Sequence, residues 1–147
     1  MTAEDKAFVA THLNDKEQAL FYAMAVFDER HALNVARTAQ KLAEGLTLDQ
    51  ELLLRVSLLH DIGRTKVSLW DKVFAVVMDK LFPTLTKRLA RKNHALHIYY
   101  HHPKIGADKL RSMGLAREAE IIAKHHDLSE AGDLPELAIL RRADEQN

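Results

Sequence analysis

The chain contains no cysteine, which excludes both a disulfide framework and a thiolate metal site. Its five glycines fall between segments of regular apolar spacing rather than within them. No apolar run approaches the roughly 20 residues of a membrane span, and the first residues lack the basic-then-apolar order of a signal peptide. These absences predict a cytoplasmic protein that has no membrane-spanning segment.

Neither sign of charge is in excess, because 21 lysines and arginines balance 21 aspartates and glutamates. A general binder of nucleic acids or anionic membranes would need a basic surface, so neither function is expected. A length of 147 residues with 47% apolar residues fits one domain with a hydrophobic core. The unusual count is nine histidines, which invites a search for a metal site.

The apolar spacing is helical nearly throughout, and the alternation typical of strands is absent. The sequence therefore predicts an all-α fold in one domain, residues 1–147, with residues 1–28 as an N-terminal helical extension packed on it. Helices are expected within 4–27, from a cap at Asp28 to Gly45, from a Thr47–Gln50 capping box to Gly63, over 69–82, over 84–100, from Pro103 to Gly114, over 115–126, and from Pro135 onward.

Several of these helices direct a polar side chain toward the core near one end. A single buried histidine is usually a hydrogen-bonded core residue, because buried polar groups find protein partners. Four helices that do this together indicate that the side chains converge on a metal ion inside a helical bundle. Nitrogen and oxygen donors without sulfur suit manganese, iron, magnesium or zinc. The residues are His31, His60 with Asp61, His125 with His126, and Asp144.

The order of these residues resembles the H…HD…D signature of the HD superfamily of metal-dependent phosphohydrolases. Four segments also resemble motifs of its HD-GYP branch: HDIGR (60–64), HPKIGADKL (102–110), HHD (125–127) and RRADEQN (141–147). The GYP element itself is missing, because LSEAGDLPELAIL follows residue 127. The resemblance covers residues 31–144 and, without GYP, argues against cyclic di-GMP as the substrate.

The resemblance implies one HD-domain helical bundle that holds two divalent ions and hydrolyses a phosphomonoester, a nucleotide or a phosphodiester. Asp61 would bridge the two ions, which would activate a water molecule. Some relatives carry a glutamate for a third ion, but Phe27 stands at that position here. The implied ligands are His31, His60, Asp61 and Asp144 for one ion, and Asp61, His102, His125 and His126 for the other.

Two cations are candidates for contact with the phosphate of a small phosphorylated substrate, for which a nucleotide is the expectation. Arg64 stands where the branch has a lysine, so it is either a catalytic phosphate clamp or a cation at a helix C-terminus. Lys72 is either a second phosphate-binding residue or a solvated surface lysine. Gly106 fits close helix packing beside the site, or simple variation within the family.

Other interpretations stay open at this point. His94, His97 and His101 share one helix face, so they line a cleft, lie in solvent or hold a separate metal, and His101 competes with His102 as a ligand. A non-catalytic binding or regulatory module is one alternative function, and an HD-type oxygenase with two iron ions is another. The apolar residues of the 69–82 helix suggest a homodimer face or a lid.

Overall fold

The computed structural model describes residues 1–64, 76–89, 94–127 and 134–147. Within these ranges the chain forms helices and no strand, so the predicted all-α fold is confirmed. The elements are α1 (Ala3–His12), α2 (Asp15–Phe21), α3 (Val26–Leu42), α4 (Gln50–Leu59), the short 3-10 helix η1 (Ile62–Arg64), α6 (Pro83–Leu89), α7 (His94–Ser112), α8 (Ala116–Lys124) and α9 (Pro135–Glu145).

Two predicted helix starts are wrong. The cap of α4 is Asp49, whose side chain accepts a hydrogen bond from the backbone N–H of Leu52 at 3.0 Å, and not Thr47. Helix α3 begins earlier than expected, with Ala25 as its N-cap. Asp28 therefore lies in the first turn of α3, where it is buried rather than capping the helix. Any nearby polar residue can satisfy free N–H groups, so position alone does not select the cap.

Helix α7 passes through Pro103, although the sequence predicted that a helix would begin there. Proline has no N–H, so the carbonyl of Tyr99, four residues earlier, loses its backbone donor. That carbonyl instead accepts a hydrogen bond from Nδ1 of His102 at 2.9 Å. The break in backbone bonding is thus compensated by a side chain, and the helix continues to Ser112.

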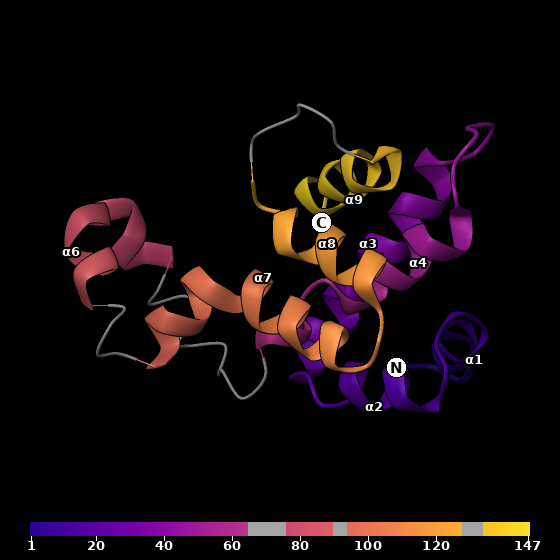
Figure 1. Ribbon diagram of the computed structural model, residues 1–147, viewed down its shortest axis with the longest axis horizontal. Coiled ribbons are helices and arrows are strands. Elements are labelled where there is room, and N and C mark those ends of the chain that lie inside the picture. Colours follow the sequence, from indigo (N-terminus) through magenta and orange to yellow (C-terminus); the bar gives the residue numbers. More distant parts are fainter. Residues whose placement is uncertain (65–75, 90–93, 128–133) are drawn as a thin grey trace.

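The main body of the molecule packs α3 against α4 and α9, and α7 against α8 and η1 (Figure 1). One apolar core joins these helices, and its largest buried side chains are Phe21, Leu53, Leu58, Leu59, Ile62, Leu110, Ile121, Ile122, Leu137 and Leu140. Each such side chain contributes about 1.5–3 kcal/mol when it leaves water. The core fixes the ends of α4, α8 and α9, where the polar residues of interest lie.

A close approach of η1 to α7 depends on two glycines. A Cβ on Gly63 would collide with the backbone of His102, reaching its Cα at 2.9 Å. A Cβ on Gly106 would lie 3.4 Å from the backbone nitrogen of Gly63, which is tight but less severe. Lys109 closes the contact by donating from Nζ to the carbonyl of Ile62 at 2.7 Å. Gly106 therefore has a packing role beside the site.

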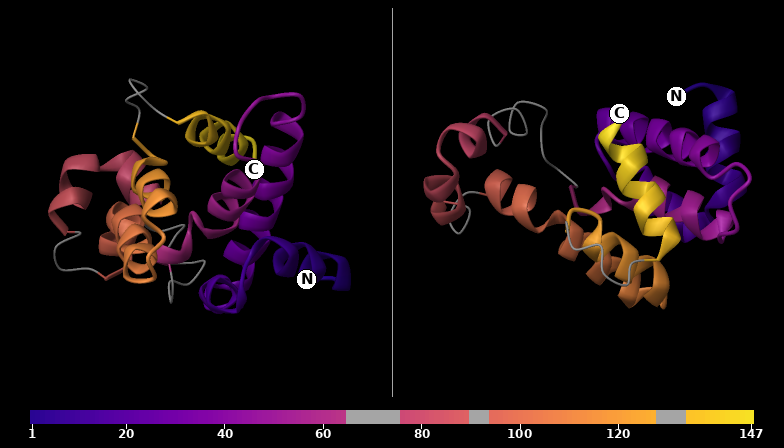
Figure 2. Two further views of the ribbon diagram at one scale, coloured as in Figure 1. Left: turned by 45° about the vertical axis from the view of Figure 1, so that its right-hand side comes forward. Right: turned by 90° about the horizontal axis from the view of Figure 1, so that it is seen from above.

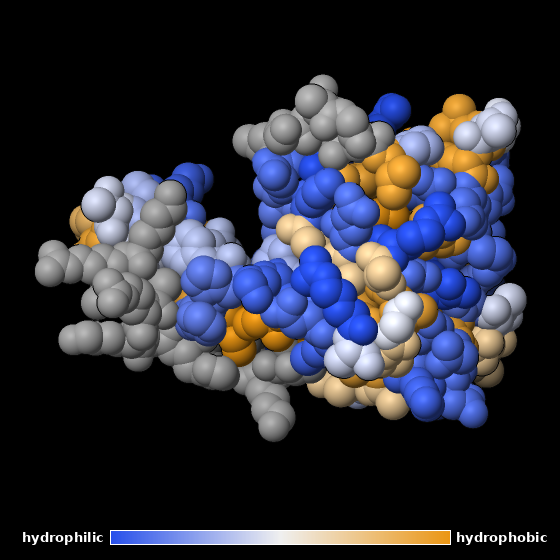
Figure 3. Space-filling model, viewed as in Figure 1, coloured by the Kyte–Doolittle hydropathy of each residue, from blue (hydrophilic) through white to orange (hydrophobic). Residues whose placement is uncertain are grey.

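Residues 76–89, here called the arm, project from the main body together with the first part of α7 (Figures 1 and 2). Of the helix predicted over 69–82, residues 76–82 are described; residues 76–81 are helical and Phe82 lies outside the helix. Several large apolar side chains of this arm are exposed: Val76, Val77, Leu81, Phe82 and Leu85. The main body, by contrast, presents a largely hydrophilic face (Figure 3). A homodimer through the arm stays a prediction.

Among the helices described, none is both long enough and apolar enough to cross a membrane.

Candidate metal centre

Two groups of three side chains form the centre. His31 of α3, His60 at the end of α4 and Asp144 of α9 are here called the carboxylate triad. His102 of α7 with His125 and His126 at the end of α8 are called the histidine triad. In each triad, one potential ligand atom per residue lies within 4.8 Å of the others. The fold therefore brings together all six of these predicted ligands from distant parts of the sequence.

The carboxylate triad is held together by hydrogen bonding. Nε2 of His31 lies 2.9 Å from Oδ1 of Asp144, and Nε2 of His60 lies 3.5 Å from the same oxygen. Burial raises the pKa of Asp144, but the bonds to the two histidines outweigh it and leave the pKa well below its usual value. Burial also lowers the pKa of His60, yet the carboxylates of Asp61 and Asp144 raise it above the ordinary value.

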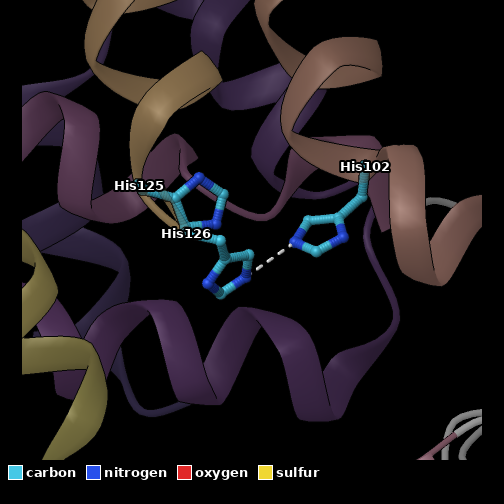
Figure 4. A group of neighbouring side chains, drawn as sticks. All are labelled: His102, His125 and His126. Carbon is cyan, nitrogen blue, oxygen red and sulfur yellow. Dashed lines mark hydrogen bonds between the residues drawn. The ribbon is translucent and has the colours of Figure 1, made fainter. Parts of the chain in front are cut away.

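The histidine triad contains only imidazoles. Nε2 of His126 lies 3.1 Å from Nε2 of His102, and the rings of His125 and His126 have centroids 4.0 Å apart (Figure 4). Burial, together with the Arg64 guanidinium, lowers the pKa of His102 to about 3. The pKa values of His125 and His126 are lowered too, chiefly by burial. At neutral pH these imidazoles are therefore uncharged, and each keeps a lone pair for a ligand.

Three of the histidines are each oriented by a hydrogen bond of the same kind, in which Nδ1 donates to the carbonyl three residues earlier. The pairs are His60 with Ser57 at 2.8 Å, His102 with Tyr99 at 2.9 Å, and His125 with Ile122 at 2.6 Å. A carbonyl only accepts, so Nδ1 carries the proton and Nε2 is left to bind something else. The carbonyls are available because α4 and α8 end there, while Pro103 frees the one within α7.

Asp61 lies between the two triads. Its Oδ2 is 3.6 Å from Nε2 of His60, and its Oδ1 is 3.5 Å from Nε2 of His102. The side chain is fully buried. Burial raises the pKa of Asp61, but the nearby charges of His60 and Arg64 lower it by more. The net pKa therefore falls well below its usual value, and the carboxylate stays ionised.

Several buried atoms at this centre make no hydrogen bond of good geometry: Nε2 of His60, Nε2 of His125 and both carboxylate oxygens of Asp61. Two of them lie in ion pairs instead, Nε2 of His60 with Asp144 and Oδ2 of Asp61 with Arg64. Leaving buried polar atoms unpaired costs about 1–3 kcal/mol each, and more for charged groups. Such atoms grouped in one place indicate a missing partner that accepts electron pairs from both nitrogen and oxygen. A divalent ion would be such a partner, so the residues present fit a metal.

Arg64 enters the same cluster from η1. Its Nη1 forms an ion pair with Oδ2 of Asp61 at 2.9 Å. Its Nη2 lies 3.1 Å from Nε2 of His102 and 3.4 Å from Nε2 of His126. The guanidinium thus lies against the histidine triad and Asp61.

A family model of the HD domain matches residues 29–145, and so covers most of the chain. The chain belongs to the HD domain family. No curated protein and no solved structure matches it. The match to this superfamily of metal-dependent phosphohydrolases confirms the resemblance seen in the sequence, while the HD-GYP branch stays a prediction. Helices α1 and α2 precede the matched region.

The remaining candidate residues predicted from the sequence are the histidines of α7 and Lys72. His102 is buried in the histidine triad, whereas His101 is exposed, so the structure favours His102 as the ligand. The rings of His97 and His101 have centroids 4.6 Å apart on the exposed side of α7. The side chain of His94 and the whole of Lys72 lie outside the described residues.

A pocket of about 320 Å³ opens beside the histidine triad of this HD domain. It is lined by Arg64, Asp79, Tyr99, Tyr100, His102, Pro103 and His126. Asp79 and the two tyrosines are not among the site residues predicted from the sequence. The tyrosines lie within one helical turn of Pro103, and this position next to a predicted ligand segment could have marked them as candidates. Nothing in the sequence pattern singles out Asp79.

Proposed function

We propose that this HD domain is a dinuclear metal-dependent phosphohydrolase that acts on a small phosphorylated substrate. The observation that carries the proposal is the position of Asp61, a buried ionised carboxylate between two triads of potential ligands. Two cations a few Å apart repel each other unless an anion lies between them. Asp61 is suited to that role, because its two oxygens face different triads.

His31, His60 and Asp144 would hold one ion, His102, His125 and His126 the other, and Asp61 would contact both. Two bound divalent ions supply Lewis acidity toward phosphoryl oxygens and make a water molecule acidic enough to act as a nucleophile near neutral pH. The protein keeps the imidazoles of the histidine triad neutral by burial. It also fixes three rings through their Nδ1 hydrogen bonds, so that Nε2 is presented to the centre.

Arg64 is proposed as the phosphate clamp. Guanidinium donates two parallel hydrogen bonds to phosphate, and Arg64 already lies beside the histidine triad and lines the pocket. The pocket volume of about 320 Å³ is near the lower end of the range for ligand sites. This size supports a small phosphomonoester over a substrate with two nucleotides.

The test is elemental analysis of the purified protein, without chelator, beside the variants Asp61→Asn and Asp108→Asn. The expected result is about two metal equivalents in the parent, a loss of metal affinity of more than about a hundredfold in Asp61→Asn, and no loss in Asp108→Asn. Asp108 is the matched control because it lies on α7 with its carboxylate exposed and paired to Lys104 and Arg111. Hydrolysis of a panel of phosphate esters by the metal-loaded protein completes the test.

The same experiment separates the other functions. Iron in the protein, with activity that disappears without oxygen, would replace the proposal by an oxygenase. Absence of metal after dialysis against manganese or iron would refute the centre and favour a binding module. Two ions bound with no ester hydrolysed would keep the centre and refute the activity.

A further inference from the structure

The pocket beside the histidine triad carries opposite charges at its two ends. Arg64, His102 and His126 line the end at the metal centre. Asp79, from the arm, lines the pocket together with Tyr99 and Tyr100 of α7. The pocket therefore carries a positive charge at Arg64, beside the metal centre, and a negative charge at Asp79, beside the tyrosines.

The two tyrosines form a corner at the Asp79 end. Their ring centroids are 5.2 Å apart and the ring planes meet at 81°. The hydroxyl of Tyr100 donates a hydrogen bond to Oδ1 of Asp79. The bond ties the carboxylate to the aromatic corner.

A carboxylate beside aromatic rings is a site for a positive group. Cations bind the faces of tyrosine rings, and an ammonium also donates charge-assisted hydrogen bonds to a carboxylate. A second phosphate or a carboxylate at this end would instead be repelled by Asp79. A ligand that fits both ends of the pocket therefore carries an anion for Arg64 and the histidines, and a cation for Asp79 and the tyrosines.

We propose that the pocket selects a phosphomonoester whose alcohol part carries an ammonium group, with Asp79, Tyr99 and Tyr100 as the specificity-determining residues. The inference deepens the proposed function and rests on it in taking the phosphoryl group to lie at the metal centre. It departs from the nucleotide expected from the sequence, because a nucleobase brings no positive charge to the Asp79 end.

The test uses pairs of phosphonates, which keep the shape of the esters but are not hydrolysed. Each ω-aminoalkylphosphonate of two to four carbons is paired with the alkylphosphonate that has the same number of heavy atoms. Calorimetry on the full chain gives the ratio of the two affinities. The best amino compound is expected to bind about tenfold more tightly than its uncharged partner. The range of chain lengths covers different spacings between the two ends.

Asp79→Asn removes the charge with little change of shape. It is expected to bring the affinity ratio close to one and to leave the affinity of the alkylphosphonates unchanged within about twofold. Tyr100→Phe keeps the ring and removes the hydroxyl, so its ratio is expected to lie between those of the parent and of Asp79→Asn. Asp108→Asn again serves as the matched control and is expected to keep the parent ratio.

Three results would overturn the inference: no binding of any phosphonate, a ratio near one in the parent, or a raised ratio that persists in Asp79→Asn. Hydrolysis of adenosine 5′-phosphate with a higher kcat/KM than any aminoalkyl phosphate would overturn it as well. The affinity ratio is measured without any hydrolysis. The proposed selectivity of the pocket and the proposed phosphohydrolase activity can therefore fail separately. Selective binding without hydrolysis of any ester would refute the phosphohydrolase and support the pocket.

Discussion

The carboxylate triad and the histidine triad share Asp61 but differ in how charge is balanced within them. The carboxylate triad has its own anion, Asp144, already hydrogen-bonded to His31. The histidine triad has no carboxylate of its own, and the Arg64 guanidinium lies against it. The pKa of His60 is raised in the first, while that of His102 is lowered in the second.

Because of this difference, we expect the carboxylate triad and the histidine triad to bind cations with different affinities. An ion at the carboxylate triad gains a full negative charge from Asp144 in addition to Asp61. An ion at the histidine triad shares Asp61 with Arg64, whose positive charge opposes it. We therefore expect the carboxylate triad to bind an ion first and more tightly than the histidine triad. The following substitutions and the pH dependence test this order of affinity.

Gly63→Ala should have the largest effect, because the added methyl collides with the backbone of His102. We expect a loss of about 3 kcal/mol in the free energy of unfolding, as for other overpacked contacts. Displacement of α7 should also abolish binding at the histidine triad and leave the carboxylate triad loaded. Denaturant unfolding and metal titration measure the two effects. Gly106→Ala is the matched control with a smaller loss, since its contacts begin at 3.4 Å; equal losses would contradict the packing argument.

Pro103→Ala should weaken the histidine triad while leaving the fold at least as stable. Alanine restores a backbone N–H, which then competes with Nδ1 of His102 for the carbonyl of Tyr99. Loss of such an orienting bond typically lowers metal affinity by about 10–100-fold. Titration with manganese checks the affinity. Pro135→Ala, at the first turn of α9, should change neither site, and an unchanged affinity in Pro103→Ala would remove the proposed role of the proline.

The stability of the metal-free protein should depend on pH with opposite signs in the two triads. Below about pH 6.5 the unfolded chain protonates His102, whereas the folded form resists this down to about pH 3. This residue therefore costs about 2 kcal/mol of stability between pH 6.5 and 5. His60 has a raised pKa, so its contribution is present below about pH 6.5 and is lost as the pH rises through the folded value.

Unfolding of His102→Gln and His60→Gln at pH 5 and pH 8 measures this contrast. The first variant should lose less stability than the parent on acidification, and the second should lose more. Changes of the same sign in both variants would show that the triads do not differ in charge balance.

Arg64→Gln should have the smallest effect on cation binding, and in the favourable direction. Removing the guanidinium leaves Asp61 fully available, so we expect the second ion to bind about tenfold more tightly. Inorganic phosphate should bind more weakly to the same variant, because its clamp is gone. Competitive titrations with manganese and with phosphate give both numbers. Weaker binding of the second ion would mean that Arg64 supports the site rather than opposing it.

The helical pattern and the chemistry of the centre could be predicted from the sequence for a physical reason. Buried apolar spacing defines a helix face, and several histidines and aspartates on such faces of different helices indicate a shared ligand, although one alone would not. The H…HD…D order then joined His31, His60, Asp61 and Asp144, and the structure brings them together.

The rest depends on contacts between distant segments. Local rules predict that a helix begins at Pro103, but α7 continues through it because the side chain of His102 satisfies the carbonyl that the proline leaves free. Asp79 lines the pocket only because residues 76–89 meet α7, which no local pattern encodes. The position of Arg64 against the histidine triad likewise required the close contact at Gly63.

The bond between His31 and Asp144 joins residues 113 positions apart. A cation bound there would act as a reversible cross-link, closing a long loop in a protein that has no cysteine for a covalent one. Constraining so long a loop removes a large part of the freedom of the unfolded chain. The domain would then gain resistance to heat and proteolysis from its metal supply, and chelators would act on its lifetime as well as on its chemistry.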